Sequence, residues 1–178
     1  MHMGIEIRPA VPADAVAVCT VLRRSITESC VEDHQNCPER LASWLGNKTP
    51  QTVAAWFTTP SNFTIVAVRE GQVVGVALLT QAGKLSLCYV LPEAMRTGVG
   101  KALLDAVETQ ARAWDIGKLQ LKSTITARDF YARNGYTFAG KEKACYGLEC
   151  DFFWKDLSQA GADAGGGSRK RFCNCSGQ

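Results

Sequence analysis

The sequence predicts an α+β protein built on one central mixed sheet. Its N-terminal part contains a short strand pattern followed by helical patterns. Residues 62–91 switch to the alternating and continuous apolar runs that are typical of strands. The remainder contains a helix, a strand, a helix and two further strands. Because most strand patterns lie next to one another along the chain, this order favours one sheet with helices on its faces.

The N-terminal elements are indicated by their periodicity and by their caps. Asp14 is a suitable N-cap for the first helix. Thr49 is a cap before Pro50, which is favoured in a first helical turn. Residues 28–36 are polar and separate the first helix from the second. The expected elements are a strand over residues 5–9 and helices over residues 15–26, 38–46 and 50–57.

The middle and C-terminal elements follow from period-two patterns and turn residues. Glu70-Gly71 is a hairpin signal between two apolar runs, and Gly117 and Gly135 each end a helix. The expected strands are residues 63–69, 72–80, 85–90, 118–123, 137–139 and 146–154, and the expected helices end at residues 113 and 134. Residues 1–157 are therefore expected to form one domain, followed by a flexible, basic Gly/Ala/Ser-rich tail over residues 158–178.

Composition excludes several functional classes. The chain has 178 residues, 46% of them hydrophobic, and a net charge of +3. Arg169, Lys170 and Arg171 lie in the tail, so the body is nearly neutral and has no electrostatic footprint for nucleic acid. No apolar run approaches the roughly 18 residues of a membrane span. With no signal-peptide core before residue 5, the expected location is the cytoplasm, with no nucleic-acid or membrane partner.

The eight cysteines do not predict a metal site. None forms a CxxC pair, and their spacing matches no zinc pattern. Most lie in apolar surroundings, where a cysteine behaves as a small hydrophobe. Cys173 and Cys175 of the tail are expected to be exposed.

A glycine-bearing loop at the start of a helix, MRTGVGK over residues 95–101, predicts a phosphate site. Unpaired N–H groups at a helix N-terminus attract anions, and glycine lets an anion approach closely. A Walker loop would need glycine where Met95 stands and a hydroxyl where Ala102 stands. A dinucleotide-binding loop would need glycine where Leu103 stands, and it would follow the first strand of the fold. Both nucleotide classes are therefore disfavoured.

This loop, together with the strand and proline before it (CYVLPEAMRTGVGKALL), resembles the GNAT superfamily of acyl-CoA N-acyltransferases. The family's loop has Arg or Gln, two variable residues, Gly, a variable residue and Gly or Ala. Met95 replaces the leading residue, and Arg96 supplies a charge one place later. A second block, STITARDFYARNGY, resembles the family's Asn-x-x-Ala-x-x-Phe-Tyr segment, with Thr124 in place of Asn. The resemblance covers about residues 5–154.

The resemblance implies a fold and a cofactor site. The fold is a mostly antiparallel sheet of about seven strands with a splayed fourth strand, and the co-substrate is acetyl-CoA with no metal. The loop amides would bind the pyrophosphate, and the splayed strand would pair with the pantetheine amides. The residues implied to bind the cofactor are Cys88, Tyr89, Val90, Met95, Arg96, Thr97, Gly98, Val99, Gly100, Lys101, Thr124, Ala127 and Phe130.

The implied reaction is direct transfer of an acetyl group from acetyl-CoA to a primary amine. Tyr131 corresponds to the family's proton donor to the leaving thiolate. The strand before the loop, KLSLCYV, carries no acid, so the candidate bases come from the polar segment, which contains Glu28, Glu32, Asp33 and His34. His34 and Glu28 are the two chosen candidate bases, because the pKa of histidine suits a base at neutral pH and Glu28 offers a carboxylate, and a water relay is the alternative. The acceptor would be a small-molecule or peptide amine, and dimers are common in the family. A catalytically silent acyl-CoA-binding module is the alternative function.

Overall fold

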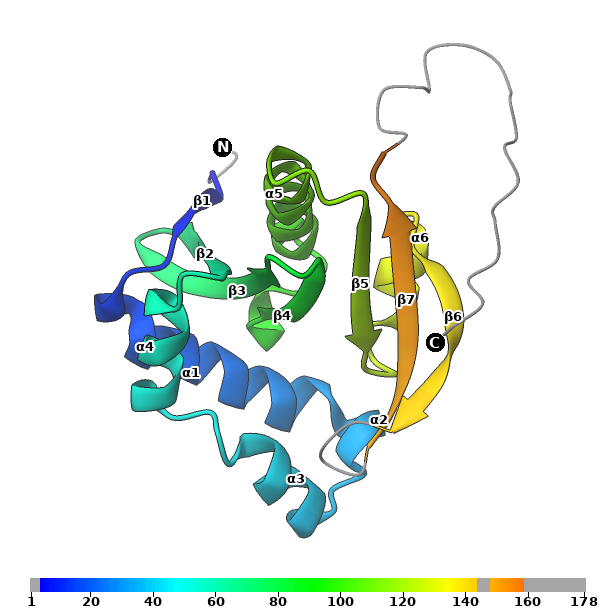
Figure 1. Ribbon diagram of the computed structural model, residues 1–178. Coiled ribbons are helices and arrows are strands. Elements are labelled where there is room, and N and C mark those ends of the chain that lie inside the picture. Colours follow the sequence, from blue (N-terminus) through cyan, green and yellow to red (C-terminus); the bar gives the residue numbers. More distant parts are fainter. Residues whose placement is uncertain (1–3, 144–147, 159–178) are drawn as a thin grey trace.

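The structure, a computed structural model, describes residues 4–143 and 148–158 (Figure 1). Seven strands form one sheet in the order β1-β2-β3-β4-β5-β7-β6. Among the described residues only β4 and β5 are parallel neighbours, and the other pairs are antiparallel. The expected mixed, mostly antiparallel sheet is confirmed. The strands are β1 (Glu6–Pro9), β2 (Asn62–Arg69), β3 (Gln72–Thr80), β4 (Lys84–Val90), β5 (Lys118–Ser123), β6 (Thr137–Lys143) and β7 (Glu149–Asp156).

Helices cover both faces of the first four strands. Figure 1 shows α1 and α4 on one face and α5 on the other. The helix α6 lies beside the second half of the sheet, between β5 and β6 in the chain. The α-helices are α1 (Ala15–Arg24), α2 (Val31–His34), α3 (Pro38–Leu45), α4 (Pro50–Thr58), α5 (Val99–Ala113) and α6 (Arg128–Arg133).

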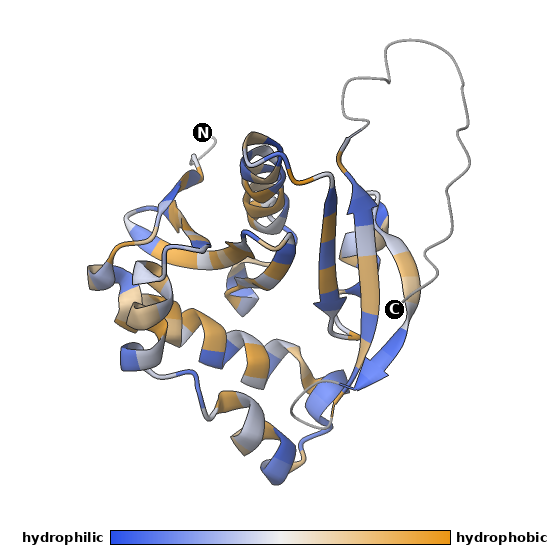
Figure 2. Ribbon diagram, viewed as in Figure 1, coloured by the Kyte–Doolittle hydropathy of each residue, from blue (hydrophilic) through white to orange (hydrophobic). Residues whose placement is uncertain are grey.

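The main core lies between these helices and the central strands. Ile65, Val66 and Ala67 are all buried, so β2 packs against helices on both of its faces. Figure 2 shows the same continuous apolar colouring along β2 and β3 and on one side of α1. This explains why the middle of the sequence contains apolar runs rather than a strict alternation.

Turn chemistry determines several element ends. The Thr49 hydroxyl accepts a hydrogen bond from Thr52 N at 3.3 Å and caps α4 as expected. Glu70 and Gly71 both have positive φ, 54° and 75°, which is the two-residue hairpin turn that the sequence predicts.

The capping role expected for Asp14 is wrong. Asp14 occupies the N-cap position of α1, but its side chain makes no capping bond to the helix. The carboxylate accepts two hydrogen bonds from Arg8, at 2.8 and 2.9 Å, and one from Val11 N. The Arg8 guanidinium holds the pKa of this carboxyl below its usual value. Asp14 therefore ties β1 to the start of α1.

Two elements differ from their expected bounds. The polar segment 28–36 contains α2, and a π-helical turn over Ser25–Ser29 extends α1. β6 continues past residue 139 to Lys143, because an edge strand tolerates charged residues. The start expected for the last strand at residue 146, Cys145, and the tail from residue 159 on lie outside the described residues.

The feature that positions the site is the separation of β4 from β5. The two strands are in register only at Lys84 with Gln120 and at Leu85 with Leu121. The pairing of β4 with β3 continues to Val90 and includes a register shift opposite Leu78 and Leu79. From Ser86 onward, the β5-facing edge of β4 has no strand partner among the described residues. The expected splayed fourth strand is confirmed.

Candidate active site

A pocket of about 810 Å³ opens where β4 and β5 separate. Its walls come from β4, the loop before α5, the start of α5, α6 and the end of α1. This size is within the usual range for small-molecule and cofactor sites. It is lined by Ser25, Ser29, Cys30, Cys88, Tyr89, Val90, Met95, Arg96, Gly98, Gly100, Lys101, Thr124, Thr126, Ala127, Asp129, Phe130, Tyr131, Arg133 and Asn134.

The loop before α5 presents unpaired main-chain donors at the mouth of this pocket. Arg96 has φ of 61° and Gly98 has φ of 91°, so the chain turns through left-handed conformations here. Within the described part of the chain, none of the main-chain N–H groups from Arg96 to Lys101 donates to another main-chain group. Successive N–H groups in such a turn form a concave anion site, and the N-terminus of α5 adds its positive dipole.

Side-chain contacts hold this loop in place. The Thr97 hydroxyl donates to Ala94 O at 2.6 Å and accepts from an Arg69 guanidinium nitrogen at 3.1 Å. The Thr97 side chain makes these contacts with the loop and β2, and the Val99 side chain is fully buried in the core. Neither residue lines the pocket. A Cβ on Gly100 would lie 3.3 Å from two ring carbons of Phe130, so this glycine lets α5 approach α6 closely. The loop is therefore anchored on both sides of its exposed turn.

Tyr131 lines the pocket and is buried. Its ring packs in edge-to-face contact with Phe130 and Tyr136, at centroid separations of 5.2 and 5.7 Å. The Tyr131 hydroxyl and the Cys88 thiol form a hydrogen bond. Burial raises the pKa of Tyr131 well above its usual value. At neutral pH the phenol is therefore protonated, and it can donate a proton to a developing anion but cannot serve as a base.

Two cysteines line the same pocket without being activated. Burial raises the pKa of Cys88 to about 12, although the hydrogen bond with Tyr131 partly opposes this. Burial also raises the pKa of Cys30 to about 12, with a smaller contribution from the Asp33 carboxylate. A nucleophilic cysteine needs a lowered pKa to form its thiolate. These two thiols are therefore poor candidates for a covalent acyl-enzyme.

The two candidate bases in the polar segment do not line the pocket. His34 is 1% exposed, and its ring nitrogens bond to the main chain. Nδ1 accepts from Asn36 N at 3.0 Å, and Nε2 lies 3.1 Å from Thr27 O, which requires the proton on Nε2. Glu28 is exposed and pairs with Arg24, which also pairs with Glu93. His34 thus has a structural role, because both ring nitrogens are hydrogen-bonded to the main chain. Glu28 belongs to an ion-pair cluster at the surface.

Asp33 has a structural role that the sequence analysis missed. Its carboxylate accepts from Ile125 N at 2.7 Å and from the Thr126 hydroxyl at 2.8 Å. These bonds join α2 to the loop between β5 and α6, 92 residues later in the chain for Ile125. Thr124 Oγ1 in turn accepts from Ala127 N at 3.2 Å and supports the start of α6. Asp33 and Thr124 together position the segment that carries Tyr131.

The structure brings most of the predicted cofactor residues together. All of them except Thr97 and Val99 line the pocket, and Tyr131 joins them. Sequence reasoning missed Asp129 and Arg133 on α6 and Asn134 at its end; for Arg133 and Asn134 the i+3 and i+4 spacing from Phe130 was the available signal. It also missed Ser25 and Ser29, which the π-helical turn brings to the pocket.

The described residues contain no group of three or more His, Cys, Asp or Glu placed to hold a metal ion. In that same part of the chain, no helix has both the length and the apolar character needed to cross a membrane.

Comparisons with known proteins identify the domain type. The sequence profile of the "Acetyltransferase (GNAT) domain" matches residues 32–150. No curated protein gives a significant match. A GCN5-related N-acetyltransferase from Rhodopseudomonas palustris is 24% identical, with a TM-score of 0.77, and the match covers 88% of this chain and 98% of that one.

Two further solved structures share the fold and were determined with a bound cofactor. PaiA N-acetyltransferase from Thermoplasma acidophilum, in complex with coenzyme A, is 20% identical with a TM-score of 0.72, covering 86% of this chain and 99% of that one. YncA, a putative acetyltransferase from Salmonella typhimurium with acetyl-CoA, is 16% identical with a TM-score of 0.66, covering 87% and 95%. At these identities the likeness establishes the fold alone.

Proposed function

Because the chain belongs to the acetyltransferase (GNAT) domain family, we propose that it transfers an acetyl group from acetyl-CoA directly to a primary amine. The observation that supports this most is the presence of an anion-binding turn and a buried phenol in the lining of one pocket. The turn at residues 96–101 offers unpaired N–H groups for a pyrophosphate. Tyr131 offers a protonated hydroxyl.

The open edge of β4 supports the orientation of acetyl-CoA in this pocket. Main-chain groups beyond Ser86 on this edge can pair with the pantetheine amides, so the cofactor adds like a short strand. A main-chain N–H in the stretch Cys88–Val90 can also stabilise the oxyanion of the tetrahedral intermediate. Arg96, Lys101 and Arg133 line the pocket and provide positive charge for the phosphates.

In the proposed reaction the amine lone pair attacks the thioester carbonyl carbon and forms the C–N bond. The C–S bond then breaks, and the electron pair leaves with sulfur. Tyr131 donates its hydroxyl proton to this thiolate and then regains a proton from solvent, and the attacking nitrogen loses its own proton to water or to the exposed Asp129. The raised pKa values of Cys30 and Cys88 favour this direct attack over a route through an acetyl-cysteine.

The experiment compares Tyr131→Phe with Tyr136→Phe in an assay of thiol release over a panel of amines. Tyr131→Phe is expected to lower kcat by about 100-fold, the lower end of general-acid effects, with the Kd for acetyl-CoA unchanged. Tyr136 is the matched control, because its buried hydroxyl has no hydrogen-bond partner among the described residues, so its loss leaves kcat unchanged. Equal kcat in wild type and Tyr131→Phe would remove Tyr131 from the reaction. Acetyl-CoA binding with no turnover on any amine would instead favour a silent acyl-CoA-binding module.

A further inference from the structure

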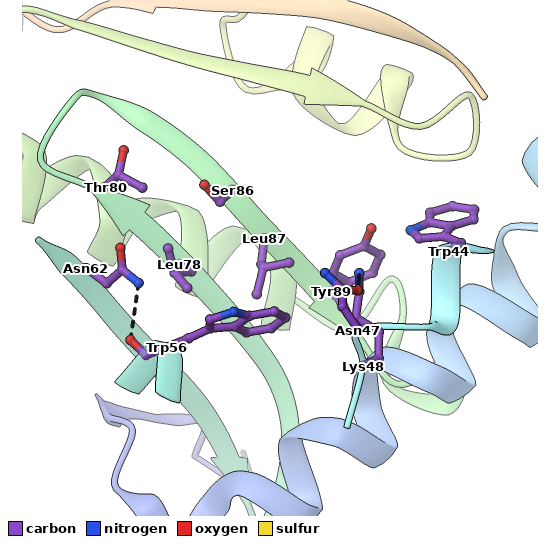
Figure 3. A pocket seen from close by; sticks show the side chains of 10 residues that line it. All are labelled: Trp44, Asn47, Lys48, Trp56, Asn62, Leu78, Thr80, Ser86, Leu87 and Tyr89. Atoms are coloured by element: carbon purple, nitrogen blue, oxygen red, sulfur yellow. Dashed lines mark hydrogen bonds between the residues drawn. The ribbon is translucent and has the colours of Figure 1, made fainter. Parts of the chain in front are cut away.

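A second pocket of about 330 Å³ adjoins the cofactor pocket at β4. Tyr89 lines both pockets, whereas Cys88 and Val90 line only the first, and Ser86 and Leu87 line only the second. Figure 3 shows the second pocket bounded by the central strands on one side and by the ends of α3 and α4 on the other. A ligand in this pocket would therefore meet the cofactor pocket at Tyr89 of β4.

The walls of this second pocket combine aromatic and aliphatic side chains with polar ones. Trp44, Trp56 and Tyr89 contribute rings, and Leu78 and Leu87 complete the apolar surface (Figure 3). Trp44 is 4% exposed and packs with Tyr89 in a small second core cluster. The end of α4 beside Trp56 is fixed by Asn62 Nδ2, which donates to Trp56 O at 3.2 Å. Rigid, aromatic walls of this kind favour a ligand with a flat or large apolar group.

Within the described part of the chain, Lys48 is the one cation that lines this second pocket. Its Nζ donates to Asn47 Oδ1 at 2.6 Å, and the residue is only 4% exposed. The Lys48 carbonyl accepts from Cys19 Sγ and from an Arg23 guanidinium nitrogen, at 3.0 and 3.1 Å, which fixes the main chain here. Burial lowers the pKa of Lys48 to about 8.

Charge complementarity selects against cationic ligands. Among the described residues, the lining of the second pocket includes no Asp or Glu that could attract a polycationic acceptor. A ligand carboxylate, by contrast, would form a charge-assisted hydrogen bond with the Lys48 ammonium in addition to the bond that Lys48 makes to Asn47. With the ligand carboxylate bound at Lys48, the ligand side chain can contact the aromatic walls. The reacting amine can then lie beside Tyr89.

We propose that this second pocket is the acceptor site and that the acceptor is a small primary amine bearing a carboxylate and an aromatic side chain, as in an aromatic amino acid. This inference rests on the proposed acetyl transfer. Its structural basis is the combination of Lys48, the three aromatic walls and the shared residue Tyr89. It also predicts that recognition of the carboxylate is lost when the Lys48 charge is removed.

The activity test uses four amines that differ by one group at a time: L-phenylalanine, L-phenylalaninamide, phenethylamine and L-alanine. With wild-type protein, kcat/KM for L-phenylalanine should exceed each of the others by about tenfold or more, the contribution expected from one charge-assisted hydrogen bond or from the buried ring. Lys48→Met should remove the preference over L-phenylalaninamide. Lys84→Met is the matched control, because Lys84 is an exposed β4 lysine outside both pockets, and it should keep the preference.

A binding test separates this inference from the proposed function. Hydrocinnamate has the ring and the carboxylate but no amine, and its binding should change the fluorescence of Trp44 and Trp56 in protein without acetyl-CoA. The change should be absent in Lys48→Met, while the Kd for acetyl-CoA stays at the wild-type value. If acetyl transfer fails but this signal is present, the proposed function is wrong and the pocket assignment stands. Equal kcat/KM for L-phenylalanine and its amide, or no hydrocinnamate signal, would overturn the inference.

Discussion

Gly98 offers a direct perturbation of the anion-binding turn. Its φ of 91° and ψ of −3° lie where a residue with a side chain is strained, although the space around an added Cβ is open. A left-handed conformation costs such a residue roughly 1–2 kcal/mol. The turn is exposed, and its N–H groups make no main-chain bonds that would hold the strained conformation in place. In Gly98→Ala the turn should therefore relax, and binding must restore the strained conformation.

The expected effect is on affinity more than on stability. Restoring 1–2 kcal/mol of strain weakens acetyl-CoA binding by about 5- to 30-fold. Gly71→Ala is the matched control, since Gly71 has φ of 75°, open surroundings and a place in the hairpin between β2 and β3. There the paired strands hold the turn, so the strain should appear as a lower Tm, by about 2–8 °C, with unchanged affinity.

Isothermal titration with acetyl-CoA and thermal unfolding of the two variants test this reasoning. The predicted pattern is a weaker Kd with little change in Tm for Gly98→Ala, and the reverse for Gly71→Ala. Wild-type affinity in Gly98→Ala would refute the anion-binding role of the turn. So would an equal loss of affinity in both variants, because it would point to a general effect of destabilisation.

Two further predictions concern buried charges. Asp33→Asn should lower the free energy of unfolding, measured in urea, by about 1.5–3 kcal/mol, because Ile125 N and the Thr126 hydroxyl lose a charged acceptor. The control Asp129→Asn, at an exposed position, should change this free energy by less than about 0.5 kcal/mol. Equal effects of the two substitutions would contradict the role of Asp33 in joining α2 to the loop before α6. Hydrocinnamate binding should weaken as the pH rises above about 8, because Lys48 loses its proton there and with it the charge that pairs with the carboxylate. Constant affinity from neutral pH to well above pH 8 would exclude a charged Lys48 from recognition.

Local patterns predicted most of the fold because they determine where these elements lie. The apolar runs of β2 and β3, the Glu70-Gly71 turn and the Thr49 cap each act over a few residues, and the structure confirms them. Asp14 shows the limit of such reasoning. Its carboxylate is suited to a helix cap, but Arg8 offers a charged partner on the neighbouring strand. The carboxylate therefore accepts hydrogen bonds from Arg8 and does not cap the helix α1.

The site was predictable only where one segment carries it. Residues 95–101 and 124–131 are contiguous blocks, so their resemblance to the family's two motifs was enough to predict residues that line the pocket between β4 and β5. The burial of His34 and the long-range bonds of Asp33 depend on tertiary contacts that no local pattern encodes. The second pocket combines residues from the end of α3, the α3–α4 loop, α4 and three strands, so its composition emerges only in the folded chain.

Calorimetric titration of the purified protein with acetyl-CoA, with ATP and NAD as controls, tests the central claim most directly. The account predicts saturable binding of acetyl-CoA at one site per chain and no binding of either nucleotide under the same conditions. Binding of ATP or NAD without binding of acetyl-CoA would contradict the assignment of the pocket between β4 and β5.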